Sequence, residues 1–193
     1  MNLDQLQGKI KNCRICEKHL PLGPRPVVQV SGLARILIVG QAPGRRVHET
    51  GVPFDDPSGD RLRSWMGIDK NIFYDPEKVA IMPMGFCFPG TGKSGDLPPR
   101  PECAVEWRQQ LLDLLPNVEL TLIIGQYAIE WHLGDSRKRI LTDTVKAWRE
   151  YWPDKAVLPH PSPRNNIWLK KNNWFEDEIL PALKSRIANV LNV

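Results

Sequence analysis

The sequence has no hydrophobic run long enough to cross a membrane. None of its 193 residues lies in an apolar stretch approaching the ~20 residues that a spanning helix needs. The first eleven residues are polar and lack the apolar core of a secretory signal. No internal repeat and no domain boundary is evident. We therefore expect a single domain over residues 1–193, in a monomeric protein of the cytoplasm.

Cysteine is scarce, with only Cys13, Cys16, Cys87 and Cys103 in the whole chain. In a reducing compartment such cysteines are more typical of metal ligands or free thiols than of disulfides. Cys13 and Cys16 form a C-x2-C pair that could bind one metal centre, and the two later cysteines could complete a shell of four thiolates. Spacing alone does not choose between zinc and an iron–sulfur cluster, nor does it exclude four unrelated cysteines. A shared metal would have a structural role.

Neither sign of charge is in large excess. Lysine and arginine number 26 against 22 aspartate and glutamate residues, which gives a formal net charge of +4. This balance allows a polyanionic partner without requiring one. A hydrophobic content of 41% and a charged content of 25% are ordinary for a globular domain with a sizeable core.

Short apolar runs alternate with helical patterns along the chain. Strands are predicted at Ile36–Val39, Val79–Met84, Leu120–Ile124 and Ala156–Leu158. Helices are predicted at Asn2–Ile15, Ser58–Gly67 (with Ser58 as N-cap), Glu102–Leu115, Gln126–Leu133 and Thr142–Tyr151, and in the tail Asn166–Val193, with a break at Pro181. The alternation predicts a three-layer α/β/α sandwich with a mostly parallel four-stranded central sheet. Gly85–Pro101 is expected to be a long irregular loop.

Two polar segments follow predicted strands directly. The turn Gly40–Gly44 (Gly-Gln-Ala-Pro-Gly) ends the first strand, and Phe54, Asp55 and Asp56 come soon after it. His160 and its neighbours follow the last strand. Ligands of open α/β sheets bind at the carboxyl edge, and right-handed crossovers place these segments there together. We interpret the first segment as part of a ligand-binding pocket.

Each of these features also has a simpler explanation. A glycine-rich turn alone occurs in many nucleotide-binding folds. Phe54 could be an ordinary core residue, and a lone histidine is more often packed than catalytic. Asp55 and Asp56 could simply cap the helix that starts near Ser58.

Three segments considered together resemble the uracil-DNA glycosylase superfamily, particularly its iron–sulfur branches, families 4 and 5. The Gly40–Gly44 turn is similar to the first active-site motif, followed as in the family by Gly51-x-Pro53-Phe54 and Ser58-Gly59. Cys87-Phe88-Pro89 and Pro98-Pro99-Arg100-Pro101-Glu102-Cys103 resemble the cysteine-bounded loop of the family. His160-Pro161-Ser162-Pro163-Arg164-Asn165 resembles the second active-site motif in its single-strand-selective monofunctional version.

The resemblance implies a role for each of these residues. Phe54 would stack on the base, and Asp56, or Asp55 if the loop is shorter, would stabilise the cationic sugar and orient water. His160 would donate a hydrogen bond to the departing base. The backbone of Gly40, Gln41, Ala42, Pro43 and Gly44 would shape the base pocket. Ser162 would contact phosphate, Pro163 and Arg164 would enter the duplex as a wedge, and Asn165 would orient the loop. The four cysteines would bind a 4Fe-4S cluster, with zinc as the less favoured occupant.

Three positions depart from patterns within the superfamily. Ala42 stands where family 1 has its catalytic aspartate, so that role would pass to Asp56. Gln41 stands where family 4 usually has glutamate. Pro83 replaces the family 4 asparagine that recognises the uracil edge, so the base could be uracil or a related deaminated base. Because no lysine lies in the site motifs, we expect monofunctional chemistry.

The sequence therefore predicts a DNA glycosylase that acts on DNA containing a deaminated base. Two alternatives stay open at this point: a protein that binds DNA or damaged bases with little or no excision, and an iron–sulfur redox or regulatory protein. Further candidates for contact with DNA are Arg45, Arg46, His48, Lys93, Arg100, Lys170 and Lys171.

Overall fold

Four parallel strands form the central sheet of the computed structural model, which describes residues 1–193. They are β1 (Ile36–Val39), β2 (Val79–Ile81), β5 (Leu120–Ile124) and β6 (Lys155–Leu158), in the order β2-β1-β5-β6. Ile36 pairs with both Val79 and Leu120, and Thr121 pairs with Lys155. All residues of β1 and β2 are buried, as expected for parallel strands covered on both faces. The predicted parallel sheet is confirmed.

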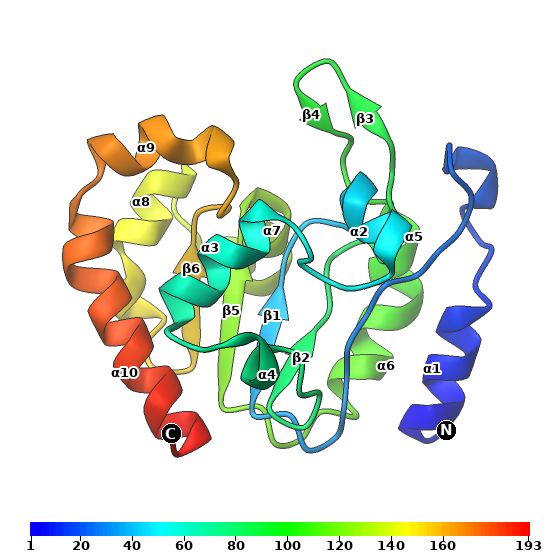
Figure 1. Ribbon diagram of the computed structural model, residues 1–193, viewed down its shortest axis with the longest axis horizontal. Helices are drawn as coiled ribbons and strands as arrows, with labels where there is room; N and C mark the ends of the chain where they lie inside the picture. Colours follow the sequence, from blue (N-terminus) through cyan, green and yellow to red (C-terminus); the bar gives the residue numbers. More distant parts are fainter.

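Helices cover both faces of this sheet (Figure 1). β1 leads to β2 through α2 (Arg45–Thr50), α3 (Pro57–Met66) and α4 (Lys70–Phe73). β2 leads to β5 through α5 (Pro101–Cys103), a π-helical turn (Ala104–Arg108) and α6 (Gln109–Leu112). β5 leads to β6 through α7 (Gln126–Leu133), a 3-10 turn (Gly134–Ser136), α8 (Leu141–Lys146) and a second 3-10 turn (Trp148–Glu150). The connection from β1 to β2 runs toward one edge of the sheet, whereas the connections from β2 to β5 and from β5 to β6 run toward the other edge. Because all three crossovers are right-handed, the first connection lies on one face of the sheet and the other two lie on the opposite face. The three-layer α/β/α architecture is confirmed.

The two ends of the chain add to these layers. At the N-terminus α1 (Leu3–Lys11) begins with a capping box on Asn2, and a 3-10 turn (Glu17–His19) follows it. The C-terminal part comprises a 3-10 turn (Pro163–Asn165), α9 (Asn166–Lys171), a π-helical turn (Phe175–Ile179) and α10 (Leu180–Leu191), and α10 packs against α3. The predicted break at Pro181 is wrong, because the chain turns between α9 and Phe175 instead. Pro181 lies in the first turn of α10, where its missing N–H is tolerated.

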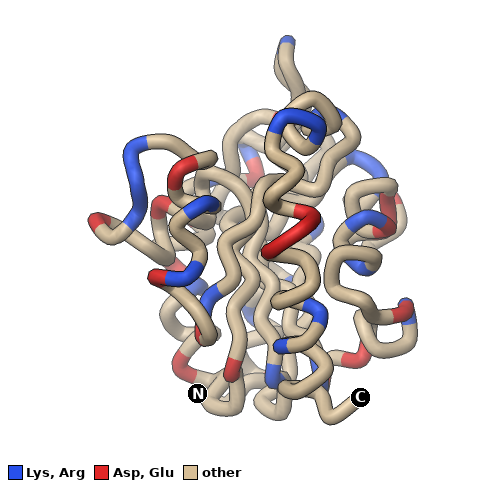
Figure 2. Tube along the Cα trace, turned by 90° about the vertical axis from the view of Figure 1, so that its left-hand side faces the viewer, with Lys and Arg blue, Asp and Glu red and all other residues tan.

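The segment predicted to be an irregular loop contains a β-hairpin. β3 (Thr91–Gly92) and β4 (Gly95–Asp96) pair in antiparallel fashion, and Gly95 has a positive φ of 137° that favours glycine. The hairpin projects beyond the body of the molecule at the carboxyl edge of the sheet (Figure 1). In Figure 2 its tip is blue, and basic and acidic segments are interspersed over the rest of the surface. No helix in the structure is both long and apolar enough to cross a membrane.

Candidate active site

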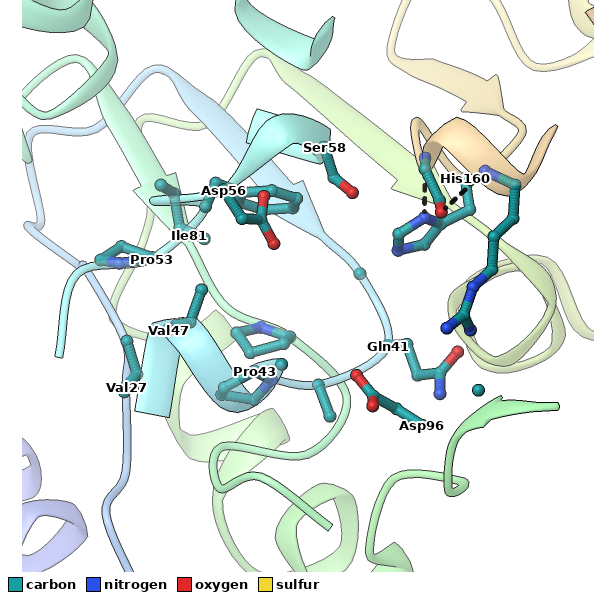
Figure 3. A pocket seen from close by; sticks show the side chains of 18 of the residues that line it. Val27, Gln41, Pro43, Val47, Pro53, Asp56, Ser58, Ile81, Asp96 and His160 are labelled. Carbon is teal, nitrogen blue, oxygen red and sulfur yellow. Dashed lines mark hydrogen bonds between the residues drawn. The ribbon is translucent and has the colours of Figure 1, made fainter. Parts of the chain in front are cut away.

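A cavity of about 450 Å³ opens at the carboxyl edge of the sheet (Figure 3). Its lining includes the predicted site residues Gly40, Gln41, Ala42, Pro43, Gly44, Phe54, Asp56, His160, Ser162, Arg164 and Asn165. Pro163 does not line it. The hairpin residues Ser94, Gly95 and Asp96, which the sequence did not suggest, form part of the wall. Segments that lie far apart in the chain therefore converge on one cavity.

The Gly40–Gly44 turn is anchored through its carbonyl groups. The carbonyl oxygens of Gly40 and Gln41 accept hydrogen bonds from the amides of Met84 and Gly85, at 2.8 and 2.9 Å. The amides of Gln41 and Ala42 make no hydrogen bond within the protein. Unpaired N–H groups on a rigid turn can bind an electron-rich ligand atom.

Phe54 is held in an unusual backbone conformation. Its φ is +54°, which is rare for a bulky residue and raises the local energy by roughly 1–3 kcal/mol. Its carbonyl oxygen accepts hydrogen bonds from Arg63 Nη1 (3.3 Å) and from the Tyr74 hydroxyl (3.4 Å). The ring lies edge-on to Phe73, with centroids 6.1 Å apart, and its tip is 3.7 Å from the position of a side chain on Gly40. These contacts fix the ring against the wall of the cavity.

Arg63 is the buried cation behind this arrangement, and sequence reasoning missed it. Its side chain is 7% exposed, forms a 2.7 Å ion pair with Asp60, and lies over the rings of Phe73 and Tyr74. A single arginine within an amphipathic helix gives no sequence signal of such a role. Arg63 therefore positions Phe54 indirectly, from α3.

Asp56 caps α3 and also lines the cavity. Its Oδ1 accepts a 2.8 Å hydrogen bond from the Gly59 amide, so the predicted cap at Ser58 is wrong by two residues. The cap moves because Pro57, which suits the first position of a helix, already lies inside it. Asp56 Oδ2 makes no hydrogen bond within the protein, and Asp55 does not line the cavity. Figure 3 shows the Asp56 carboxylate on the same side of the cavity as Ser58.

His160 is oriented by its own loop. Its Nδ1 accepts a 3.1 Å hydrogen bond from the Ser162 amide, which assigns the proton of the neutral ring to Nε2. Burial lowers the pKa of His160, and the carboxylates of Asp56 and Asp96 oppose this shift only in part. The ring is therefore a neutral donor at neutral pH. Asn165 Nδ2 donates to the His160 carbonyl at 2.7 Å and so links the two ends of the loop.

Arg61 connects the two motif-bearing segments. From α3 it donates to the Ser162 carbonyl at 3.2 Å and to Asn166 Oδ1 at 2.8 Å. The helix that starts at Asp56 is thus tied to the loop that positions His160. These hydrogen bonds fix the position of Asp56 relative to His160 across the cavity.

Arg164 lies across the β3–β4 hairpin. Its Nη1 donates to the Ser94 carbonyl at 3.3 Å, and it occupies the space that a side chain on Gly95 would need, 2.2 Å from that position. The arginine predicted to enter a duplex therefore contacts a neighbouring segment in this structure. Pro163 starts the adjacent 3-10 turn.

The model of the family described as the uracil DNA glycosylase superfamily matches residues 29–184 of the chain. The chain belongs to this superfamily. The match spans the whole central sheet and every cavity-lining residue except Val27. It assigns the chain to a family of proteins that act on DNA, and it confirms the resemblance to the superfamily as a whole. Cys13 and Cys16 precede the matched residues.

Pro83 also lines the cavity, and its carbonyl group is already bound within the protein. Arg108 Nη2 donates to the carbonyl oxygens of Pro83 (2.5 Å) and Met82 (3.2 Å). The Pro83 carbonyl is therefore engaged by Arg108, and the side chain of this lining residue is an apolar ring.

Arg108 itself is fully buried and has no carboxylate partner. Its Nη1 contacts His132 Nε2 at 3.2 Å, and its guanidinium group lies 5.2 Å from the centre of the Trp131 ring. Burial lowers the pKa of Arg108 to about 10 and, together with the Arg108 charge, lowers the pKa of His132 to about 3. His132 is thus a neutral acceptor for a buried cation. Neither residue stood out in the sequence.

The four cysteines lie near one another and form no disulfide. Cys16, Cys87 and Cys103 are buried, and Cys13 is half-buried. Burial raises the pKa of the Cys87 thiol to about 12, and the three other cysteines add to the rise. No group of three or more histidine, cysteine, aspartate or glutamate side chains has the arrangement of a metal-ion site. The four thiols nevertheless lie close enough to influence one another electrostatically.

Proposed function

We propose that the protein is a monofunctional DNA glycosylase that hydrolyses the N-glycosidic bond of uracil, or of a related deaminated base, in DNA. One observation supports this above all others. In a member of the superfamily, the Asp56 carboxylate and the Nε2–H donor of His160 line the same cavity, beside the ring of Phe54. A carboxylate and a neutral donor around one aromatic face are what base excision requires.

The target nucleotide would leave the base stack and enter the cavity, because its glycosidic bond is unreachable inside a duplex. Phe54 would stack on the extruded base, a contact worth about 1–3 kcal/mol. Because the Phe54 backbone is fixed by Arg63 and Tyr74, little further ordering is needed when the base enters.

His160 would stabilise the departing base. As the C1′–N bond breaks, its electron pair moves onto the base, and negative charge develops on the base oxygen. A neutral Nε2–H donor and the unpaired amides of Gln41 and Ala42 suit that charge. The lowered pKa keeps the ring neutral, so His160 donates a hydrogen bond without losing its proton to the base.

Asp56 would act on the sugar and on water. Its negative charge opposes the positive charge that develops on the deoxyribose, and its free Oδ2 can accept the proton of a water molecule that attacks C1′. The base leaves with the bonding electron pair and later takes up a proton, so the products are an abasic sugar and the free base. No lysine lines the cavity, which favours hydrolysis by water over a Schiff-base route.

The base-recognising wall supports a broader substrate class than uracil alone. The Pro83 side chain offers neither a donor nor an acceptor to the base edge, and its backbone carbonyl is bound to Arg108. Polar groups remain at Ser94 and Asp96 on the hairpin. The proposed substrates are therefore uracil, hypoxanthine and xanthine in DNA.

A panel of oligonucleotides that each contain one of these bases tests the proposal. The native protein should release at least one of them, and both Asp56→Ala and His160→Ala should abolish release. Asp55→Ala is the matched control, because that neighbouring carboxylate does not line the cavity. Tight binding of the damaged strand without release of any base would instead establish a damaged-base binding protein.

We also propose that Cys13, Cys16, Cys87 and Cys103 hold a 4Fe-4S cluster. One zinc ion would bring its four sulfur atoms within roughly 3.8 Å of each other, given Zn–S bonds of about 2.3 Å. A cluster of several irons separates its thiolates more widely. The convergence of the four cysteines supports a shared centre, and the resemblance to the iron–sulfur branches of the superfamily favours the cluster. The cluster would have a structural role, joining the segment after α1 to the segment that bears the hairpin.

Metal analysis of the purified protein tests this assignment independently of activity. Four irons per chain, with a brown colour that is lost in a Cys16→Ser variant, is the expected result. One zinc per chain in a colourless protein would contradict it. Because the role is structural, mild oxidation or reduction should leave base release unchanged, and a redox-dependent activity would favour a regulatory protein.

A further inference from the structure

A second cavity, of about 510 Å³, lies beside the candidate active site. Its lining comprises Lys18, His19, Leu20, Pro21, Arg45, Phe88, Pro89, Gly90, Thr91 and Leu97. We call it the basic groove.

The basic groove and the first cavity share their dividing wall. On the hairpin segment, Ser94 and Asp96 face the first cavity, whereas Thr91 and Leu97 face the groove. At the start of α2, Gly44 lines the first cavity and the next residue, Arg45, lines the groove. A strand whose base occupies the first cavity would therefore meet the groove within a nucleotide or two.

The positive charges of Lys18 and Arg45 in the groove are not balanced by acidic residues of its lining. No aspartate or glutamate lines it, and neither Lys18 nor Arg45 forms an ion pair. Two acids close to the groove are already paired, whereas Asp96 on the dividing wall lines the first cavity, accepts a 3.4 Å hydrogen bond from Thr91 and forms no ion pair. Glu102, which lies close to His19, is bound to Arg100, and Glu17 is paired with Arg14 at 2.5 Å.

The floor of the groove is aromatic and buried. Phe88 is fully buried, and the Arg45 guanidinium group lies over its ring, 5.7 Å from the centroid. The His48 ring packs against the same phenylalanine at 6.1 Å. A cation held over an aromatic ring loses less side-chain entropy on binding an anion than a free surface arginine does.

We propose that the basic groove binds the phosphodiester backbone of the target DNA strand, next to the extruded nucleotide. Lys18 and Arg45 would each neutralise one phosphate, while the hairpin would separate the extruded base from its neighbour. The strand would then run from the Ser162–Asn165 loop, past the first cavity, to the groove. This inference rests on the proposed function, because it places the rest of the strand around the same site.

Salt dependence of DNA binding gives the sharpest test. The probe is an oligonucleotide that carries a stable abasic analogue, measured by fluorescence anisotropy between about 50 and 200 mM salt. Losing two phosphate contacts should reduce the slope of log affinity against log salt by roughly 1.4–1.8, at about 0.7–0.9 per contact. Across that salt range, the affinity of the native protein should fall roughly 7- to 12-fold more than that of the Lys18→Ala/Arg45→Ala variant.

A charge-matched double variant controls for net charge. Lys70→Ala/Lys184→Ala also removes two unpaired cations, from α4 and α10. Lys184 packs on Gly67 at the far end of α3, and α4 lies at the opposite end of the molecule from the hairpin (Figure 1). This variant should keep the native slope, whereas an equal reduction in both variants would overturn the assignment to the groove.

Short substrates give an independent readout. Base release is measured from two single strands that carry the target at the 5′ end or the 3′ end. The Lys18→Ala/Arg45→Ala variant should release the base more slowly than the native protein from only one of these strands. With the strand that has no nucleotides on the groove side, the two proteins should release the base equally fast. If the native protein releases the base but the Lys18→Ala/Arg45→Ala variant keeps the native salt slope, the proposal that the groove binds the strand is wrong. No base release from any substrate overturns the proposed function itself.

Discussion

The carbonyl oxygen of Phe54 lies 1.8 Å from the point where a side chain on Gly59 would begin. Only glycine can occupy that position of α3, because any other residue would collide with the Phe54 backbone. The Ser58-Gly59 pair of the motif is thus explained by packing as much as by chemistry. The close approach keeps Phe54 at its positive φ and directs its ring to the cavity wall.

Replacing Gly59 with alanine should therefore reduce both stability and activity. The clash is with backbone, which cannot move aside cheaply, so we expect a loss of about 2–4 kcal/mol in the free energy of unfolding. Gly8→Ala in α1 is the matched control, because nothing lies within 4 Å of its added carbon. That variant should be stabilised by about 0.5–1 kcal/mol. Urea unfolding measures both, and a Gly59→Ala protein as stable as the native one would contradict the packing argument.

Asparagine at position 56 should separate helix capping from catalysis. An asparagine side chain caps helices as well as aspartate does, so Asp56→Asn should unfold at nearly the native urea concentration. It removes the negative charge, so the single-turnover rate of base release should fall by roughly 10²–10⁴-fold. A stable variant with native activity would remove Asp56 from the proposed mechanism.

His132 should make the protein sensitive to acid. Its folded pKa of about 3 lies below the ordinary value of 6.5, so between these values only the unfolded state binds the proton. The stabilisation is therefore complete above pH 6.5 and is lost as the pH falls toward 3. From pH 7 to pH 5 this amounts to about 2 kcal/mol.

A His132→Gln variant isolates that contribution. Glutamine can still accept the hydrogen bond from Arg108 but does not titrate. Between pH 7 and pH 5, the variant should lose about 2 kcal/mol less stability than the native protein, as measured by urea unfolding at each pH. Equal losses in the two proteins would show that His132 is not the titrating group.

Pro83→Asn should narrow the choice of base. It places a donor and an acceptor on the wall that is otherwise apolar, and the backbone carbonyl can stay bound to Arg108. If the cavity is the base pocket, the ratio of uracil to hypoxanthine release should rise by about tenfold, as expected for one or two added hydrogen bonds. Release of each base from matched oligonucleotides measures the ratio, and an unchanged ratio would place Pro83 away from the base edge.

Much of the site could be predicted because its motifs are continuous in sequence and follow strands. The strand limits at Ile36–Val39 and Leu120–Ile124 were predicted correctly, because buried parallel strands are uninterrupted apolar runs. Once those strands are parallel, the Gly40–Gly44 turn and His160 must meet at one edge of the sheet.

Other parts of the site depend on contacts between distant residues. The hairpin contributes Asp96 to the cavity although its strands are only two residues long, too short for a period-two pattern. Arg108 binds the Pro83 carbonyl across 25 positions of the chain, and nothing in its own helix indicates that contact.

The sequence by itself determined the layered α/β fold, the family and the two motif-bearing edge segments, since hydrophobic periodicity and contiguous motifs are local properties. Only the tertiary structure decided that Asp56, and not Asp55, lines the cavity. It also decided that Gly59 must leave room for the Phe54 carbonyl, and that the hairpin divides the cavity from a basic groove. These features depend on distances between segments that the chain brings together only when it packs.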